Sequence, residues 1–325
     1  MKILKSFTLP VTLLLCACGG SGGGLNTSAG PNDPVSSMAI TSANAEPAAK
    51  VAYETAIGST QLSDLGGSLG LTGAGSGDFA KPSVGVRTAG FLANVMLKIP
   101  FGPDVFPCAQ SGSITVSGNL ADPLTLTVND NFVVESTACD DGLGEVVDGI
   151  LRFTVTAFGG DLLSGAYLIS MATTAENLQV SNTEDTVTSN GDVDITLDTR
   201  TPLFVIASVS GGSMTADSDT ISESLTNYSS LQTLDLEAAE PLYTLDASGD
   251  LASTRLPGSV RYSTPVQFEG SGEDYPSMGE LLVIGDSSSA RLIAIDNVNV
   301  QIEVDNNGDG VVDDTISTTW AALSD

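Results

Sequence analysis

Apolar and polar residues alternate one by one in two stretches of the C-terminal half of the chain. Residues 192–198 place Val193, Ile195 and Leu197 on one side of the backbone and three aspartates and a threonine on the other. Residues 297–304 alternate in the same way, with asparagine, glutamine and glutamate on the polar side. Since successive side chains of a β-strand point to opposite faces, this period of two predicts strands with one buried and one solvent-exposed face.

Less regular versions of the same pattern fill the rest of residues 105–325. They predict strands at 150–158, 167–172, 203–209, 260–268, 281–284 and 290–295. Turn-forming sequences are expected to separate the strands, at Asn190-Gly191, Gly211-Gly212, Ser248-Gly249-Asp250, Pro257-Gly258 and Asp286-Ser287-Ser288. About a dozen strands with short connections predict a mainly β protein, an antiparallel meander that forms a sandwich, an open barrel or an elongated roll.

The chain is strongly acidic and contains no histidine. Its 40 acidic and 11 basic residues give a net charge of −29 at pH 7, which repels nucleic acid and favours calcium or cationic partners. Without histidine the chain cannot form a Ser-His-Asp triad, a Cys-His nucleophile pair or a histidine-ligated zinc site. We therefore expect no nucleic-acid partner, and a protein without catalytic residues is the first hypothesis.

The N-terminus has the charge order and length of a secretory signal. Lys2 and Lys5 precede an apolar run at residues 7–15, which is too short to span a membrane. The sequence Leu15-Cys16-Ala17-Cys18 resembles the lipobox of bacterial lipoproteins, which implies removal of residues 1–17 and acylation of Cys18 with diacylglycerol and palmitate. Gly19, where inner-membrane lipoproteins carry Asp, implies an outer-membrane anchor facing the periplasm or the cell surface. An ordinary secretory signal is the alternative.

Two segments of different amino-acid composition precede the strands. Residues 18–48 are rich in Gly, Ser, Ala and Asn and poor in large apolar residues, so they predict a flexible linker. Residues 49–104 are expected to be a helical region. Apolar residues at 48–57 and at 91–99 recur at helical spacing within or beside it, and a glycine-rich connector at 66–77 separates these two stretches.

Two cysteines remain once the lipobox is set aside. Cys108 and Cys139 would both face an oxidising compartment, where leftover thiols pair, so we expect a disulfide between them. A redox or catalytic thiol is the alternative, although the chain offers neither a CxxC spacing nor a histidine to generate a thiolate.

A loop near the C-terminus has the spacing of a calcium site. Positions 1, 3, 5, 7 and 9 supply oxygen atoms, from the side chains of Asp305, Asn307, Asp309 and Asp313 and the backbone carbonyl of Val311. Position 6 is the expected glycine, but position 12 is Ile316 in place of a bidentate glutamate. The loop predicts a hairpin tip that binds a structural calcium ion weakly, and a polar turn without an ion is the alternative.

The C-terminal part of the chain resembles a family of uncharacterised proteobacterial lipoproteins. The residues that carry the resemblance are Pro276 to Gly285, Ala290-Arg291-Leu292, the loop from Val304 to Asp314 and Thr319-Trp320. A β segment between two cysteines, following an Ala-rich helical region, extends it loosely over residues 108–325. The resemblance implies architecture and location, and no activity.

These features together predict a membrane-anchored lipoprotein that serves as a non-catalytic envelope or surface interaction module. Its expected partners are the membrane, through the N-terminal lipid, and an unidentified envelope or extracellular molecule. Two alternatives stay open: a histidine-free carbohydrate-active enzyme with an Asp/Glu pair across a groove, and a carrier of lipophilic ligands.

Overall fold

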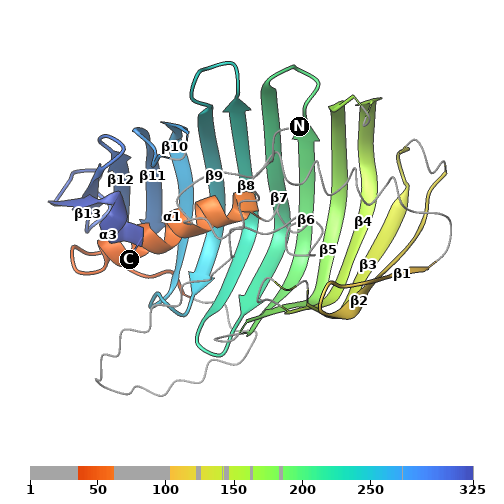
Figure 1. Ribbon diagram of the computed structural model, residues 1–325. Helices are drawn as coiled ribbons and strands as arrows, with labels where there is room; N and C mark the ends of the chain where they lie inside the picture. The colour runs from red at the N-terminus through yellow and green to blue at the C-terminus, as the bar shows by residue number, and fades with distance from the viewer. Residues whose placement is uncertain are drawn as a thin grey trace.

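The computed structural model describes residues 36–61, 103–121, 126–140, 142, 146–161, 164–182, 186–272 and 274–324. Within them, 14 strands form one open sheet in the order β1 to β14, and every neighbouring pair is antiparallel (Figure 1). The predicted mainly β meander is confirmed, as a single unclosed sheet. The predicted signal peptide, Cys18 and the expected helix at 91–99 lie outside the described residues.

The elements follow the chain in order. The strands are β1 (Asp104–Pro107), β2 (Ser111–Asn119), β3 (Asn131–Asp140), β4 (Val146–Asp161), β5 (Ala166–Ser181), β6 (Thr186–Asp198), β7 (Phe204–Asp217), β8 (Ser222–Asp235), β9 (Leu242–Ser253), β10 (Ser259–Ser271), β11 (Met278–Gly285), β12 (Ser288–Ala294), β13 (Asn299–Asp305) and β14 (Asp314–Thr319). Helix α1 (Ala45–Gln61) precedes them and the short helix α3 (Trp320–Ser324) follows.

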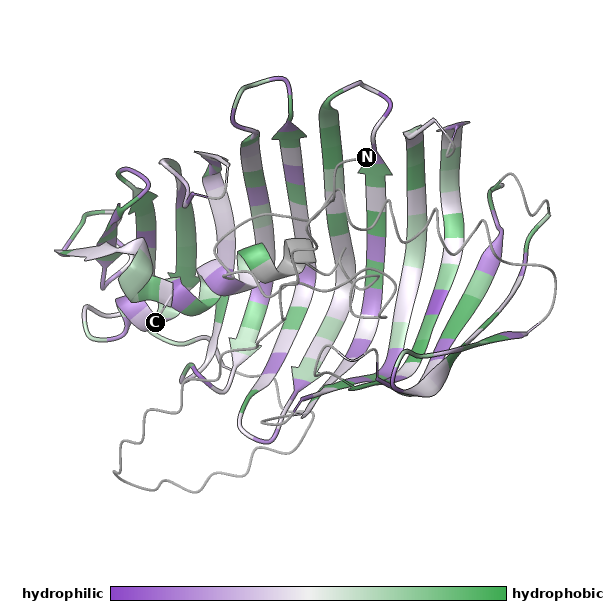
Figure 2. Ribbon diagram, viewed as in Figure 1, coloured by the Kyte–Doolittle hydropathy of each residue, from purple (hydrophilic) through white to green (hydrophobic). Residues whose placement is uncertain are grey.

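The alternation in the sequence corresponds to the two faces of the sheet, as the banding of the strands in Figure 2 shows. Val193, Ile195 and Leu197 of β6 are all buried, while the aspartates between them face solvent or lie at its border. The predicted alternation at residues 297–304 is also observed, except at its start. Val298 is 56 % exposed because it lies in the turn before β13.

Helix α1 covers the apolar face of the C-terminal half of the sheet, over β7 to β13. Its buried side combines the larger residues Val51, Tyr53 and Ile57 with a stripe of small ones, Ala45, Ala48, Ala49, Ala52 and Ala56. Side chains this small let a helix approach a sheet closely, so that the larger apolar residues of the strands fill the space between them.

The described part of the expected linker is not a flexible coil. Residues 36–44 run along the sheet before α1, and Met38 and Ile40 are buried in the same core as the helix. The N–H of Met38 donates to the carbonyl of Ser259, and the N–H of Ile40 donates to Ser288 Oγ. Two isolated apolar residues among small polar ones thus suffice to attach the segment, which the average composition of residues 18–48 did not indicate.

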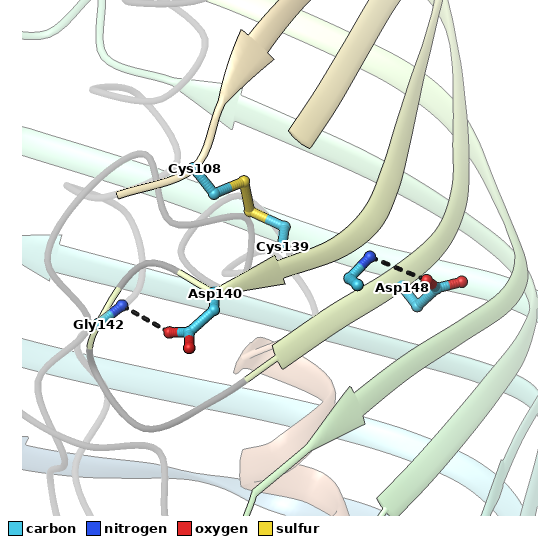
Figure 3. Close-up of a disulfide and its surroundings, with 6 residues drawn as sticks. Cys108, Cys139, Asp140, Gly142 and Asp148 are labelled. Atoms are coloured by element: carbon cyan, nitrogen blue, oxygen red, sulfur yellow. Dashed lines mark hydrogen bonds between the residues drawn. A yellow bond between two sulfur atoms is a disulfide. The ribbon is translucent and has the colours of Figure 1, made fainter. Parts of the chain in front are cut away.

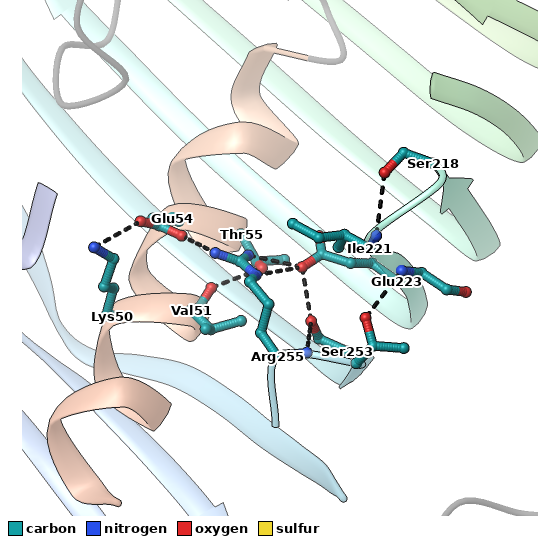
Figure 4. A network of polar contacts seen from close by, with 11 residues as sticks. Lys50, Val51, Glu54, Thr55, Ser218, Ile221, Glu223, Ser253 and Arg255 are labelled. Carbon is teal, nitrogen blue, oxygen red and sulfur yellow. Dashed lines mark hydrogen bonds and ion pairs between the residues drawn. The ribbon is translucent and has the colours of Figure 1, made fainter. Parts of the chain in front are cut away.

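A polar cluster attaches α1 to the strands on one side (Figure 4). Arg255, in the turn after β9, pairs with Glu54 of α1 and with Glu223 of β8, the latter at 2.7 Å. Lys50 adds a longer contact of 3.9 Å to Glu54. Burial opposes the charge on Arg255, but the two glutamates outweigh it and raise the pKa of the guanidinium. The helix is therefore held by charge as well as by its alanine stripe.

Three of the five expected turns lie inside strands. Asn190-Gly191 is in β6, Gly211-Gly212 is in β7 and Ser248-Gly249-Asp250 is in β9, so the strands are longer than predicted. Pro257-Gly258 and Asp286-Ser287 do form turns, as predicted. At these three positions, glycine and asparagine therefore have a structural role other than forming a turn.

Part of the explanation is a line of β-bulges that crosses the sheet. Residues with positive φ occur at or beside register shifts in β2 to β6 and in β8: Gly112, Ala138, Gly149, Asn177, Gly191 and Asn227. Side chains from the next strand accept the free backbone N–H groups, as when Asn190 Oδ1 accepts from Asn177 at 2.7 Å. Bulges bend strands, and Figure 1 shows the sheet curling at its β1–β4 end. Apolar residues on both sides of the bulge line, such as Cys139 and Leu151, consequently join one core.

The second reason for glycines inside these strands is the packing of tyrosine rings against glycines of the adjacent strand. A Cβ on Gly211 would lie 2.4 Å from the Tyr228 hydroxyl, and one on Gly249 would lie 2.9 Å from the Tyr262 hydroxyl. Both tyrosines are buried. A side chain at either glycine would displace a ring, so these glycines are required for cross-strand packing and not for a turn.

Candidate functional site

The acidic hairpin, defined as residues 305–313, connects β13 to β14. Its carboxylate oxygens accept hydrogen bonds from backbone N–H groups of the same loop. Asp305 accepts from Asn307 at 3.2 Å, from Gly308 at 2.7 Å and from Gly310 at 2.8 Å. Asp309 accepts from Val311 at 2.8 Å. These bonds bend the loop tightly, with positive φ at both glycines.

The N–H groups favour the ionised form of Asp305. The bond from Gly310, together with those from Gly308 and Asn307, holds the pKa of this carboxyl below its usual value, against the opposing effect of desolvation. Asp313 closes the other end of the loop, since its Oδ2 accepts from the N–H of Asn306 at 2.8 Å. The loop is thus ordered by its own side chains.

The hairpin also contacts the rest of the protein. Asn306 Oδ1 accepts from the N–H of Ser42, in the segment just before α1, at 3.1 Å. Gly308 lies against the β11–β12 turn, where a Cβ would come within 2.9 Å of the Ser287 carbonyl oxygen. The loop therefore helps to fix the N-terminal segment against the sheet.

The predicted calcium ligands meet only part of what an ion requires. Within the described residues no group of three or more acidic, cysteine or histidine side chains is arranged to hold a metal. The oxygens of Asp305, Asn307 and Asp309 accept backbone hydrogen bonds, and Ile316, at position 12, lies in β14 and supplies no oxygen. Calcium at this loop stays a prediction, with an affinity on the order of 10⁻⁴ to 10⁻³ M.

The expected disulfide joins Cys108 to Cys139 (Figure 3), with their Cα atoms 5.5 Å apart. It connects the β1–β2 turn to the end of β3, next to the bulge at Ala138. Asp148 accepts the N–H of Ala138 at 2.9 Å, so one acidic residue of the neighbouring strand supports the bulge. The bridge is structural, because Cys139 is buried within the apolar core of this end of the sheet.

The polar face, defined as the exposed side of β5 to β9, is a second candidate contact surface in the described residues. Its strands align short side chains in rows, such as Ala172–Asp194–Ser210–Ser229–Ser248. Hydroxyls of adjacent strands bond directly: Ser170 to Thr196 at 2.8 Å, Ser229 to Ser248 at 3.0 Å and Thr233 to Thr244 at 2.7 Å. Rows of hydroxyls and carboxylates about 4.8 Å apart form a flat hydrogen-bonding surface.

Charges on and beside the polar face are mostly acidic. Arg200 bonds Asp198 at 2.7 Å and lowers the pKa of that carboxyl, and Arg261 bonds Asp250 at 2.8 Å. Asp192 instead accepts the N–H groups of Gly212 and Ser213 at the bulge line. The face can therefore donate and accept hydrogen bonds while attracting cations. That these residues are polar is evident in the sequence, but their alignment in rows is not, since the register between the strands depends on the bulges.

Trp320 attaches the end of the described chain to the core. It is fully buried in α3, and its Nε1 donates to the carbonyls of Pro276 and Asp296, both at 3.1 Å. Its ring stacks parallel to Tyr275 with centroids 5.8 Å apart and packs on Tyr53 at 4.6 Å. This tryptophan is thus not available as a ligand platform.

Comparison with protein-family models, curated proteins and solved structures returned no match to this chain. Neither helix in the part of the chain that the structure describes has the length and apolar composition needed to cross a bilayer.

Proposed function

We propose that the protein is a lipid-anchored, non-catalytic interaction module of the bacterial cell envelope, whose polar face contacts a partner. The observation that carries the proposal is that face: a sheet with one side buried and the other presenting mainly short polar side chains in aligned rows over β5 to β9, with Leu231 and Leu242 exposed among them. A flat, wet surface of this kind suits recognition of another polar surface better than enclosure of a small substrate.

The anchor rests on the sequence. Leu15-Cys16-Ala17-Cys18 supports acylation at Cys18, and Gly19 supports outer-membrane sorting. The bridge between Cys108 and Cys139 agrees with an oxidising compartment. A weakly bound calcium ion at the acidic hairpin belongs to the same proposal, as a support for the β13–β14 end of the sheet.

The anchor can be tested by mass spectrometry and fractionation. We expect the native N-terminal peptide to begin at acylated Cys18, and we expect Cys18→Ala to leave the membrane fraction. An unmodified N-terminus on a protein that fractionates without membranes would refute the anchor.

The contact surface can be tested by site-specific photo-crosslinking in intact cells. A photoreactive residue at Ser229, in the middle of the polar face, should give a discrete adduct. The matched control is Asp219, which is also exposed but lies in the β7–β8 turn. Equal labelling from both positions, or turnover of a polysaccharide or ester by the purified protein, would contradict the proposal.

A further inference from the structure

The two edges of the open sheet differ in how they are protected. Strand β1 has four residues, ends at Pro107, which has no N–H, and continues directly into the disulfide at Cys108. Strand β14 has six residues, Asp-Thr-Ile-Ser-Thr-Thr, without proline, lysine or arginine. Proteins normally shorten, charge or interrupt exposed edges because free backbone groups recruit other strands. The first edge follows this rule, and the second follows it only at its initial aspartate.

The backbone of β14 presents free groups on its outer side. The N–H of Trp320 donates to the carbonyl of Val298 at 3.1 Å, which makes these two residues a hydrogen-bonded pair of the β13–β14 ladder. Such pairs alternate along an antiparallel ladder, so Thr318 and Ile316 bond to β13 while Ser317 and Thr315 direct their backbone outward. The N–H of Thr315 donates to Asp314 Oδ1 at 2.8 Å, which leaves the N–H and carbonyl of Ser317 and the carbonyl of Thr315 to pair with a further strand. In the described chain no strand follows β14 in the sheet.

The side chains of β14 leave room for another strand. Thr315 and Ser317 are exposed on the polar side. On the other side Ile316 lies opposite the fully buried Ile302 but is itself only partly covered. An added strand would extend the apolar face over Ile316 and pair the outward backbone of Ser317.

The charges around this edge select the partner. Glu303 lies directly across from Thr315, Asp314 begins the strand, and the acidic hairpin adjoins it with Asp305, Asp309 and Asp313. Arg291 on β12 lies opposite Glu303 in the register and 3.9 Å from Glu280, so it offsets part of the charge of β13, while Asp314 and the acidic hairpin stay without a basic neighbour on β13 or β14. A second copy of the chain would bring like charges together at this edge, whereas a basic strand would neutralise them.

We infer that the β14 edge binds an extended, basic segment of a partner protein by β-strand addition. The inference rests on the proposed function in treating the protein as a binding module, and it assigns a second contact site, separate from the polar face. Main-chain hydrogen bonds to the N–H and carbonyl of Ser317 and to the carbonyl of Thr315 supply the pairing, and the surrounding carboxylates supply the preference for lysine and arginine.

The probe is a fluorescent octapeptide of alternating lysine and valine, and its binding to the full chain in detergent is measured by anisotropy. The wild type should bind it, and should not bind the peptide with glutamate in place of lysine. Ser317→Pro removes one outward N–H that β13 does not use and should weaken binding by about tenfold or more. Ser317→Ala keeps that N–H and should bind as the wild type does.

A second probe keeps the test decisive if Ser317→Pro fails to fold. The same basic peptide, N-methylated at every second residue, keeps its charge but cannot complete a ladder, so it should bind the wild type at least about tenfold more weakly. Equal binding of the methylated peptide would show general attraction to an acidic surface and would overturn the inference. A wild-type dimer that Ser317→Pro dissociates would overturn it too, because a second copy would then occupy the edge.

Failure of this inference can be separated from failure of the proposed function. Crosslinking from Ser229 in cells carrying Ser317→Pro reports on the polar face alone. If the Ser229 adducts persist but the basic peptide does not bind as expected, only the β14 edge site is refuted. If the peptide binds as expected but Ser229 gives no adduct, only the polar face is refuted.

Discussion

Removing the disulfide tests whether the β1–β3 end of the sheet depends on a covalent link. The bond joins residues 31 positions apart. In the chain-entropy model, a closed loop of this length stabilises the folded state by about 3.7 kcal/mol at 25 °C, because it restricts the unfolded chain. The described fold of roughly 240 residues would gain about 0.5 kcal/mol/K of entropy on unfolding, so losing the bond corresponds to a melting shift of about 7 °C.

The assay compares thermal and urea unfolding with and without a phosphine reductant. The wild type should lose about 3.7 kcal/mol on reduction, while the double variant Cys108→Ala/Cys139→Ala should be insensitive to reductant. The variant controls for effects of the reductant itself. It should be somewhat less stable than the reduced wild type, because Cys139 is buried and truncation leaves a small cavity.

Identical unfolding of the oxidised and reduced wild type would refute this reasoning. Reduction would then remove a constraint that the unfolded chain does not need, because residual structure keeps the cysteines close.

Three further predictions concern charge and metal. Arg255→Ala should destabilise the protein by about 2 kcal/mol in urea unfolding, because Glu54 and Glu223 lose their common partner. The control Arg261→Ala breaks an exposed pair and should cost at most about 0.5 kcal/mol. Equal losses of stability in the two variants would contradict the role of the polar cluster. Since the pKa of Asp305 is below its ordinary value of 3.8, this carboxylate stabilises the fold above that pH and the contribution disappears as pH falls through the lowered pKa. Measured with EDTA present, Asp305→Asn should therefore melt below the wild type at pH 7 and approach it near pH 2, and a constant difference would argue against the backbone bonds. Calcium at about 10 mM should raise the melting temperature of the wild type relative to EDTA and leave Asp309→Ala unchanged, and superimposable wild-type curves would dismiss the ion.

Much of the fold could be predicted from the sequence because burial imposes a local pattern. The alternation around Val193 and Val300 identifies which side chains face the core, and this depends only on the two-residue repeat of a strand. The pairing of Cys108 with Cys139 could also be predicted, from chemistry and not from geometry, since no other cysteines were left to pair.

The lengths of the strands could not be predicted, because glycine has two uses that look alike in a sequence. Gly258 lies in the turn between β9 and β10, while Gly211 and Gly249 lie inside strands and make space for Tyr228 and Tyr262. Distinguishing these cases requires knowledge of which residue lies opposite in the next strand. That depends on the register of the whole sheet, and a sequence read one segment at a time does not contain it.

The same dependence on register explains why neither contact surface was visible in the sequence. Ser210, Ser229 and Ser248 are ordinary exposed residues until the ladder aligns them, and Ser317 has a free N–H only because Trp320 bonds to Val298. The acidic hairpin is the opposite case, since its spacing is evident in the sequence but its oxygens are used within the loop. In a meander such as this one, binding surfaces arise from the relation between strands, so the rows and edges of the sheet are more informative about contacts than a local motif.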